Sequence, residues 1–251
     1  MRCGFLSLVI YLFSLPVVAE TVSLQAVTRC PYVCDIKSDK KGILIDITDY
    51  IFTRAGYKVN YQIHPWARVV NAVNKGNIDG IIGATRKNVP DLLFPQHALM
   101  LSKIEFFVRH NETWQYKGLA SLFKKRIGVI NNLSYGKMDS YIRKYTKNPR
   151  RILIISGKRT LSRSTNMLQA KRIGAVLEDK IVMSYFLKQQ GLQSKIQPAG
   201  GVSGENIYIA FSPLRPYAQK YTDLVSTSLE ENDVQHKMKE ILAAYQLSSE
   251  N

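Results

Sequence analysis

Short apolar runs alternate with amphipathic stretches along most of the 251 residues. Apolar residues that recur every three or four positions indicate a helix, and uninterrupted apolar runs of four to eight indicate a buried strand. We expect strands at 22–27, 57–64, 79–83, 104–109, 126–130, 152–155, 175–177 and 206–211, and helices at 44–55, 66–73, 135–145, 161–169, 180–190, 214–229 and 234–245. The Pro- and Gly-containing stretch 198–204 is expected to be a loop. This alternation predicts an α/β fold with crossover connections.

Two of the apolar runs, 104–109 and 206–211, bracket the middle of the chain. If both strands cross between two compact units, residues 20–108 and 209–251 form a first lobe and residues 109–208 a second. A cleft between such units is a preferred ligand site, and the crossing strands would act as hinges for closure. We therefore predict two lobes, each with a mixed sheet flanked by helices.

The N-terminus has the order of a secretory signal. Met1-Arg2 is positively charged, residues 3–15 are mostly apolar, and Pro16-Val17-Val18-Ala19 supplies small residues suited to cleavage. The apolar run is shorter than the roughly 20 residues that a membrane span needs. We expect residues 1–19 to be a signal peptide cleaved after Ala19, and the mature chain to be soluble.

The chain is strongly basic, with a formal net charge of +16. Such a field attracts anionic ligands, anionic membrane surfaces or nucleic acid. The basic residues include separate groups at 124–126, 150–151 and 171–172, without interleaved aromatic residues. We interpret the charge as an aid to solubility with weak affinity for surfaces, and we expect no nucleic-acid partner.

Removal of the signal leaves two cysteines, Cys30 and Cys34. An even pair in an exported chain favours a disulfide, and two free buried thiols are the alternative. The four histidines, at 64, 97, 110 and 236, have no metal-ligand spacing, so we predict no metal site and no cofactor.

Catalysis has little support in the sequence, which contains no phosphate-binding loop, zinc-protease motif or nucleophile elbow. Glu178 and Asp179 are adjacent, and on a strand they would point to opposite faces and form no carboxylate dyad. The sequence therefore favours a binding protein over an enzyme.

Several short motifs follow one another through the mature chain. They are Pro31-Tyr32, residues 42–47, Ala55-Gly56-Tyr57, residues 65–68, residues 76–80, Ala84-Thr85-Arg86, residues 126–129, Ser134-Tyr135 and residues 171–179. In this order they resemble the bacterial extracellular solute-binding protein family 3, the periplasmic amino-acid-binding components of ABC importers and their relatives. The resemblance implies a type II periplasmic-binding fold, a periplasmic monomer, a small-molecule ligand such as an amino acid, and an ABC permease as partner.

The resemblance also implies roles for particular residues. Arg86, after a small apolar strand, matches the arginine that holds a ligand carboxylate, whose two oxygens fit the rigid fork of a guanidinium. Asp179 matches the acid that takes an α-ammonium, although it could instead cap the following helix. Tyr32 corresponds to an aromatic wall of the first lobe. Ser134, with Tyr135 beside it, is expected to cap a helix and to donate to the same carboxylate.

Residues 65–68, Pro-Trp-Ala-Arg, resemble a subgroup of this family in which the side chains of Trp66 and Arg68 would face the cleft. Helical spacing favours a core position for Trp66 instead. The predicted function is capture of a small carboxylate-bearing ligand, an amino acid or a related metabolite, for an ABC importer. The alternatives are a sensor of the same fold, or a cyclohexadienyl-dehydratase-like enzyme, which would need a cleft acid with a raised pKa.

Overall fold

The computed structural model describes residues 20–245 and residue 247, so the predicted signal peptide lies outside the described residues. The strands are β1 Thr21–Ala26, β2 Lys58–Ile63, β3 Gly80–Ala84, β4 Met100–Arg109, β5 Ile127–Ile130, β6 Ile152–Ile155, β7 Ala175–Asp179 and β8 Ile196–Phe211. The helices are α1 Ile43–Arg54, α2 Trp66–Asn74, α3 Asp139–Tyr145, α4 Thr160–Gln169, α5 Lys180–Gln189, α6 Ala218–Ser228 and α7 Asn232–Ala244, with 3₁₀ helices η1 Leu119–Leu122 and η2 Gly136–Met138. Within this described part, no helix is long and apolar enough to cross a membrane.

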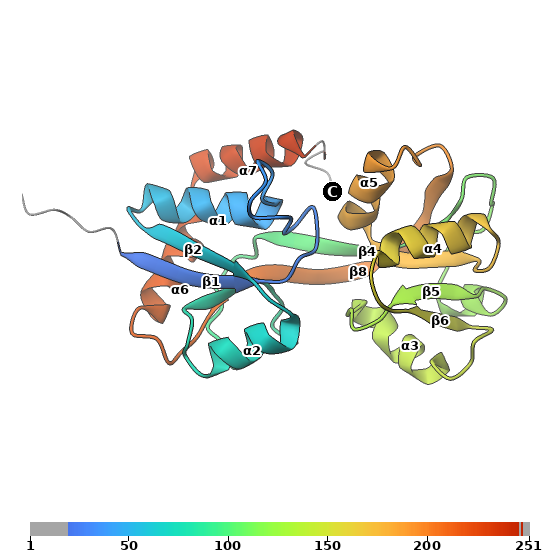
Figure 1. The fold of residues 1–251 in the computed structure, drawn as a ribbon, viewed down its shortest axis with the longest axis horizontal. Coiled ribbons are helices and arrows are strands. Elements are labelled where there is room, and N and C mark those ends of the chain that lie inside the picture. The colour runs from blue at the N-terminus through green and yellow to red at the C-terminus, as the bar shows by residue number, and fades with distance from the viewer. Residues whose placement is uncertain (1–19, 246, 248–251) are drawn as a thin grey trace, which may run out of the picture.

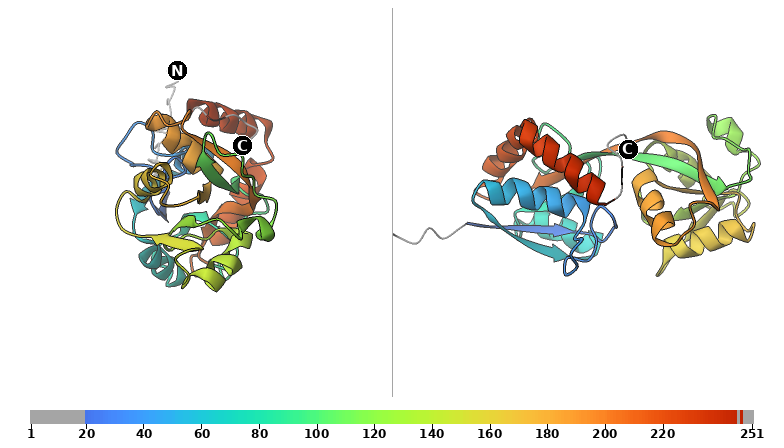
Figure 2. Two further views of the ribbon diagram at one scale, coloured as in Figure 1. Left: turned by 90° about the vertical axis from the view of Figure 1, so that its right-hand side faces the viewer. Right: turned by 90° about the horizontal axis from the view of Figure 1, so that it is seen from above.

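One eight-stranded sheet runs through two lobes that lie at opposite ends of the molecule (Figure 1). Its strand order is β2-β1-β3-β8-β4-β7-β5-β6. We call β1–β3 with α1, α2, α6 and α7 lobe 1, and β5–β7 with α3–α5 lobe 2. The long strands β4 and β8 pair with each other and connect the lobes, as the view from above also shows (Figure 2). The predicted two-lobed α/β fold is confirmed.

Strand β8 is longer than the sequence suggested, because residues 198–204 lie within it. The loop prediction is wrong for a steric reason. The glycines that indicated a loop instead permit close contact with β4, since an added Cβ at Gly204 would overlap the carbonyl oxygen of Ser102. The glycine-rich stretch therefore holds the crossing strands together.

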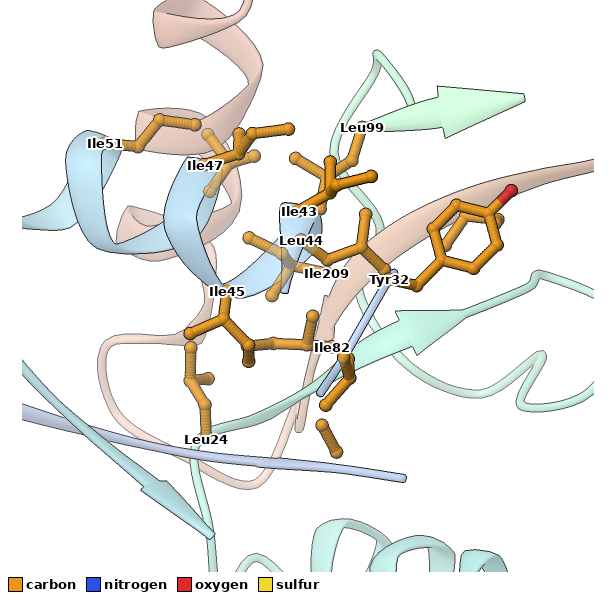
Figure 3. Close-up of a cluster of buried hydrophobic side chains, with 14 of the residues drawn as sticks. Leu24, Tyr32, Ile43, Leu44, Ile45, Ile47, Ile51, Ile82, Leu99 and Ile209 are labelled. Atoms are coloured by element: carbon orange, nitrogen blue, oxygen red, sulfur yellow. The ribbon is translucent and has the colours of Figure 1, made fainter. Parts of the chain in front are cut away.

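Lobe 1 is built around the apolar side of α1, which packs against the sheet (Figure 3). Fully buried aliphatic side chains come from the helix and from three strands, including Leu24, Ile45, Ile47, Ile82 and Ile209. Burial of each such side chain contributes roughly 1.5–3 kcal/mol. Tyr32 lies at the end of this cluster, and its hydroxyl points away from the aliphatic groups (Figure 3).

Lobe 2 contains three parallel strands in the order β6-β5-β7. All five residues of β7 are buried, because one core covers each of its faces. Such strands read as nearly continuous apolar runs, which is why this one was visible in the sequence. The last residues of β5 and β7 lie beside lobe 1 residues, and ligand sites of open α/β sheets lie outside such carboxyl ends.

Candidate ligand-binding cavity

A cavity of about 630 Å³ lies between the lobes. Its wall is mostly aliphatic and aromatic, and both lobes and both crossing strands contribute to it. Contributors include Leu44, Trp66 and Ile82 from lobe 1, Leu133 and Phe186 from lobe 2, and Ser102, Ile104 and Ile207 from β4 and β8. An apolar cavity with a few convergent polar groups is typical of a small-molecule site.

An ion pair on the cavity wall joins the two lobes. Arg29 follows β1, and its Nη2 donates to Oε1 of Glu178, in β7, at 2.7 Å. The Glu178 side chain is 1% exposed, and burial raises the pKa of its carboxyl although the Arg29 guanidinium opposes that shift. Its other oxygen, Oε2, accepts no hydrogen bond from the described residues. The pair thus offers a cation and an open carboxylate oxygen in an apolar setting.

Asp179 also lines the cavity, and its carboxylate is already occupied by the protein. Oδ1 accepts from the backbone N–H of Val182 at 3.0 Å and so caps α5. Oδ2 accepts from the hydroxyl of Ser102 at 2.6 Å, and the Tyr32 hydroxyl lies 3.1 Å from both oxygens. The capping role considered from the sequence is therefore present, and both oxygens are engaged.

Tyr32 is held in a short loop closed by the Cys30–Cys34 disulfide, which confirms that pairing. The ring is buried, and its hydroxyl reaches Asp179 in the other lobe. Burial and the neighbouring Asp179 carboxylate raise the pKa of the Tyr32 phenol far above its usual value. Tyr32 therefore remains a neutral hydrogen-bond donor and forms a second contact between the lobes.

Ser134 lines the cavity but does not cap a helix. Its hydroxyl and the backbone N–H of Tyr135 both donate to Asp139, at 2.9 and 2.7 Å. The capping prediction is wrong because a 3₁₀ turn intervenes and the carboxylate of Asp139 reaches back to these donors. Lys87 of lobe 1 completes the arrangement, with Nζ 2.9 Å from the Asp139 carboxylate and 3.7 Å from that of Glu205.

The Tyr135 side chain points into the lobe 2 core rather than into the cavity. It is 1% exposed, and its hydroxyl accepts a hydrogen bond from the backbone N–H of Ile130 at 2.7 Å. Its role in the structure is to fix the loop after β5.

Arg86 is not among the residues that line the cavity, although its neighbour Thr85 is. Its guanidinium carbon lies 4.9 Å from the ring centre of Phe94 and 5.0 Å from that of Tyr208. Its Nη2 donates to the carbonyl oxygen of Pro95 at 3.0 Å. Cation–π contacts of this kind stabilise a guanidinium against aromatic faces, so the side chain is engaged in lobe 1.

Trp66 and Arg68 of the Pro-Trp-Ala-Arg motif line different hollows. Trp66 lines the cavity and is 37% exposed, so it is not the core residue that helical spacing alone indicated. Arg68, two residues further along α2, lines a different hollow with Gln25 and Gln62 on lobe 1. The structure thus brings Tyr32, Trp66, Ser134 and Asp179 together and leaves Arg68, Arg86 and Tyr135 elsewhere.

Sequence reasoning missed Arg29, Glu178 and Glu205. Arg29 had a usable signal, because it is the first charged residue after β1 and strand ends face ligand sites. Alternation along a strand predicts opposite faces for Glu178 and Asp179. Both nevertheless line the cavity, because Asp179 ends β7 and turns to cap α5.

Comparison with known proteins shows similarity at the level of structure. No protein-family model and no curated protein matches the sequence. A probable amino-acid ABC transporter extracellular-binding protein, ytmK from Bacillus subtilis, matches with a TM-score of 0.72 and 16% identity, over 93% of this chain and 100% of that chain.

Two further structures show how widely this fold is used. The GluR0 ligand-binding core from Nostoc punctiforme, in complex with L-glutamate, matches with a TM-score of 0.65 and 17% identity, over 86% of this chain and 96% of that chain. A histidine kinase sensor domain with similarity to periplasmic binding proteins matches with a TM-score of 0.67 and 17% identity, over 90% and 96%. The chain therefore has the type II periplasmic-binding fold, which it shares with a probable transporter binding protein, a ligand-binding core and a sensor domain.

Proposed function

We propose that the chain is a periplasmic solute-binding protein. It captures a small carboxylate-bearing ligand, an amino acid or a related metabolite with an apolar body, and delivers it to an ABC importer. The observation that carries this proposal is the Arg29–Glu178 pair, which places a cation and an anion side by side in a mostly apolar cavity. A zwitterion with an apolar side chain complements all three features.

In this proposal Arg29 is the carboxylate anchor. The groups that the sequence indicated for this task have other partners, since Arg86 stacks on two rings and Ser134 donates to Asp139. A guanidinium has five N–H donors, so Arg29 can bind a ligand carboxylate while it remains near Glu178. The ligand ammonium would take the open oxygen of Glu178 or the carboxylate of Glu205, and Asp179 would position Tyr32 and α5.

The lobes would close because only the closed state completes the contacts from both sides. A ligand that binds the closed state better shifts a pre-existing equilibrium toward it. The contacts from Arg29, Tyr32 and Lys87 to lobe 2 already join the lobes in this structure, and a ligand bound between the lobes would add to them.

A thermal-shift screen of the mature chain would test the ligand class, with amino acids, small di-acids and polyamines as probes. A ligand specific for the folded state raises the unfolding midpoint by mass action. We expect a saturable rise with an apolar amino acid and none with polyamines, which lack a carboxylate. A rise with polyamines alone would refute a carboxylate ligand.

Calorimetry on the responding ligand would then test the anchor. Arg29→Ala should weaken binding by about 2 to 5 kcal/mol, the usual cost of removing one partner of a buried charge pair. Arg86→Ala is the matched control, because it removes the same group beside the cavity. A larger loss for Arg86→Ala than for Arg29→Ala would restore the assignment made from the sequence.

Export and partnership need separate measurements. Mass spectrometry of the periplasmic protein should give a mature chain that begins at Glu20, and light scattering should give a monomer. Genes for a permease and an ATPase beside this one would support the importer. A neighbouring kinase gene would instead support a sensor, the second candidate, which the structural likeness to a histidine kinase sensor domain favours.

An enzyme on the same scaffold has one supporting observation, because Glu178 is a cavity carboxyl whose pKa is raised by burial. Such a group could transfer a proton if Arg29 released it. Incubation of the mature chain with a cyclic dienyl acid, followed by mass spectrometry, would detect loss of water if this activity exists. Unchanged substrate would leave binding as the function.

A further inference from the structure

The basic groups that are separate in the sequence meet at one end of lobe 2. β5, β6 and β7 are parallel, and basic residues closely precede each strand, at 124–126, 150–151 and 171–172. The amino ends of parallel strands lie at one edge of a sheet, opposite their carboxyl ends. Because the carboxyl ends of β5 and β7 meet the cavity, the basic groups lie at the edge of lobe 2 that faces away from it.

Backbone and side-chain contacts confirm that these segments adjoin. The N–H of Ile127 donates to the carbonyl oxygen of Arg151 at 2.8 Å, and that of Gly174 donates to the carbonyl oxygen of Arg126 at 2.7 Å. Nη1 of Arg126 donates to the carbonyl oxygen of Arg172 at 3.1 Å. Three stretches of sequence thus form one surface.

We call this surface the basic end, made up of Lys124, Arg126, Arg150, Arg151, Lys171 and Arg172. None of the six forms a salt bridge with any carboxylate of the described residues. Lys125, beside Lys124 in the sequence, is left out because it pairs with Glu112, which also pairs with Arg109. The positive charge of the basic end is therefore not neutralised within the described chain.

The charge asymmetry between the two predicted lobes is large. Residues 109–208 hold 19 Lys and Arg against 5 Asp and Glu, whereas residues 20–108 and 209–251 together hold 15 against 14. Nearly all the net charge of the mature protein is therefore in the second lobe. Three of the five acids there, Glu178, Asp179 and Glu205, line the cavity, which leaves the opposite end the more positive.

Exposed apolar side chains accompany the basic end. Leu119 in η1 and Phe123 just after it are 57% and 68% exposed. The guanidinium carbon of Arg151 lies 4.3 Å from the centre of the Phe123 ring and 5.7 Å from that of Tyr145. Apolar side chains beside clustered cations are typical of surfaces that bind at a lipid–water interface.

We propose that the basic end of lobe 2 docks on an anionic phospholipid surface, with Leu119 and Phe123 entering the headgroup region. Charge complementarity supplies the attraction, and the two apolar side chains favour a bilayer over a soluble polyanion, which has no apolar layer to receive them. Docking by this end leaves the cavity accessible, because the cavity lies at the other end of the same strands. The protein would search for its partner along the membrane surface.

Co-sedimentation of the mature protein with vesicles tests the proposal. One set contains only phosphatidylcholine, and the other contains equal parts of phosphatidylcholine and phosphatidylglycerol. The lobe 2 variant carries Lys124→Gln, Arg150→Gln and Arg172→Gln, and the matched lobe 1 control carries Lys37→Gln, Lys58→Gln and Lys75→Gln, all at exposed positions. Both variants lose three charges, so only position distinguishes them.

We expect binding to the anionic vesicles alone, and weaker binding as salt is added. Each cation near an anionic bilayer contributes roughly a five-fold gain in affinity, so the lobe 2 variant should bind about a hundred-fold more weakly. The lobe 1 control should bind like the wild type. Equal weakening of both variants, or equal binding to both kinds of vesicle, would overturn the proposal.

A second variant separates a bilayer from a soluble polyanion. Leu119→Ser with Phe123→Ser keeps every cation, so it should bind the anionic vesicles at least ten-fold more weakly and bind polyphosphate unchanged. Full retention of vesicle binding would overturn entry of the apolar side chains. Tight binding of polyphosphate without vesicle binding would assign the basic end to a soluble polyanion. Unaltered thermal unfolding of each variant shows that the fold is intact.

Discussion

Removal of the Arg29 side chain should destabilise the ligand-free protein through Glu178. The Arg29 guanidinium is the charged partner of Glu178, and the two groups come from different lobes. In Arg29→Ala the Glu178 carboxylate stays in its buried position without compensation. The variant therefore tests whether the pair stabilises the arrangement of the lobes independently of any ligand.

The expected magnitude follows from burial. The Glu178 side chain is 1% exposed and that of Arg29 is 29% exposed. Breaking a buried pair by removing one partner costs about 3 to 5 kcal/mol, and the partial exposure of Arg29 places this pair near the lower limit. We expect a loss of about 3 kcal/mol, a large part of the 5 to 15 kcal/mol that stabilises a typical domain.

Urea unfolding, followed by far-ultraviolet circular dichroism, would measure this loss in a double-mutant cycle. Glu178→Gln removes the carboxylate together with its desolvation cost, so it should be the milder change. In the double variant with Arg29→Ala, most of the 3 kcal/mol should be recovered, with a coupling of about 2 kcal/mol. Arg54→Ala is the control, because it breaks ion pairs with Glu231 and Asp233 at the surface and should leave the stability almost unchanged.

The pH dependence has a definite sign. Burial raises the pKa of Glu178 above its reference value of 4.5, and loss of Arg29 would raise that pKa further. A carboxyl with a raised pKa in the folded state adds stability below its unfolded pKa and loses it as pH rises through the folded pKa. The deficit of Arg29→Ala should therefore be small near pH 4.5 and reach its full size at neutral pH. A deficit that is the same at both pH values would refute this reasoning.

Three further predictions concern the scaffold. Asp79→Asn should cost about 2 to 3 kcal/mol at pH 7 in urea unfolding. Burial raises the pKa of the Asp79 carboxyl, but its hydrogen bonds, including one from Arg215 at 2.7 Å, outweigh burial and hold that pKa below 3.8. The stability deficit of the variant should therefore shrink as pH falls through the lowered pKa. A deficit that persists there would show that the ionised carboxylate is not the stabilising form. Gly204→Ala should lower stability by about 1 to 3 kcal/mol because its methyl group would overlap the backbone of β4, and an unchanged thermal midpoint would show that the strands can separate at no cost. Cys30→Ala with Cys34→Ala should lower the free energy of unfolding by about 2 kcal/mol, since the loop closed by the disulfide is short. Reducing agent should lower the thermal midpoint of the wild type to that of the variant and leave the variant unchanged.

Local patterns were sufficient for most of the fold. The apolar spacing in α1 and the continuous apolar run of β7 each report burial directly, so the sequence located both. Residues 198–204 were wrongly predicted to be a loop, because glycine occurs both in turns and where two backbones approach closely. Only the position of β4 beside these residues distinguishes the two uses, and that position depends on the tertiary structure.

The site was harder to predict, because side chains choose partners that are distant in sequence. Nothing near Arg86 indicates that Tyr208 will provide a ring for its guanidinium. Tyr32 and Trp66 were predicted because the residues around them resemble a family in which these positions face the cleft, and both line the cavity. Asp139 lies only five residues beyond Ser134, so the hydrogen bond between them could have been predicted from the local sequence.

The path of β8 has a consequence for how the protein is made. β3 pairs with β8 as well as with β1, so the sheet of lobe 1 is complete only after residue 211 has been synthesised. Lobe 1 therefore depends on contacts between distant parts of the chain, which slow folding because loop closure precedes the gain from those contacts. Lobe 2 lies wholly within the intervening segment and can fold on shorter-range contacts. A nascent chain thus lacks a complete first lobe until residue 211 has been synthesised. For the export that we propose, this delay would keep the N-terminal portion of the chain available to the export machinery.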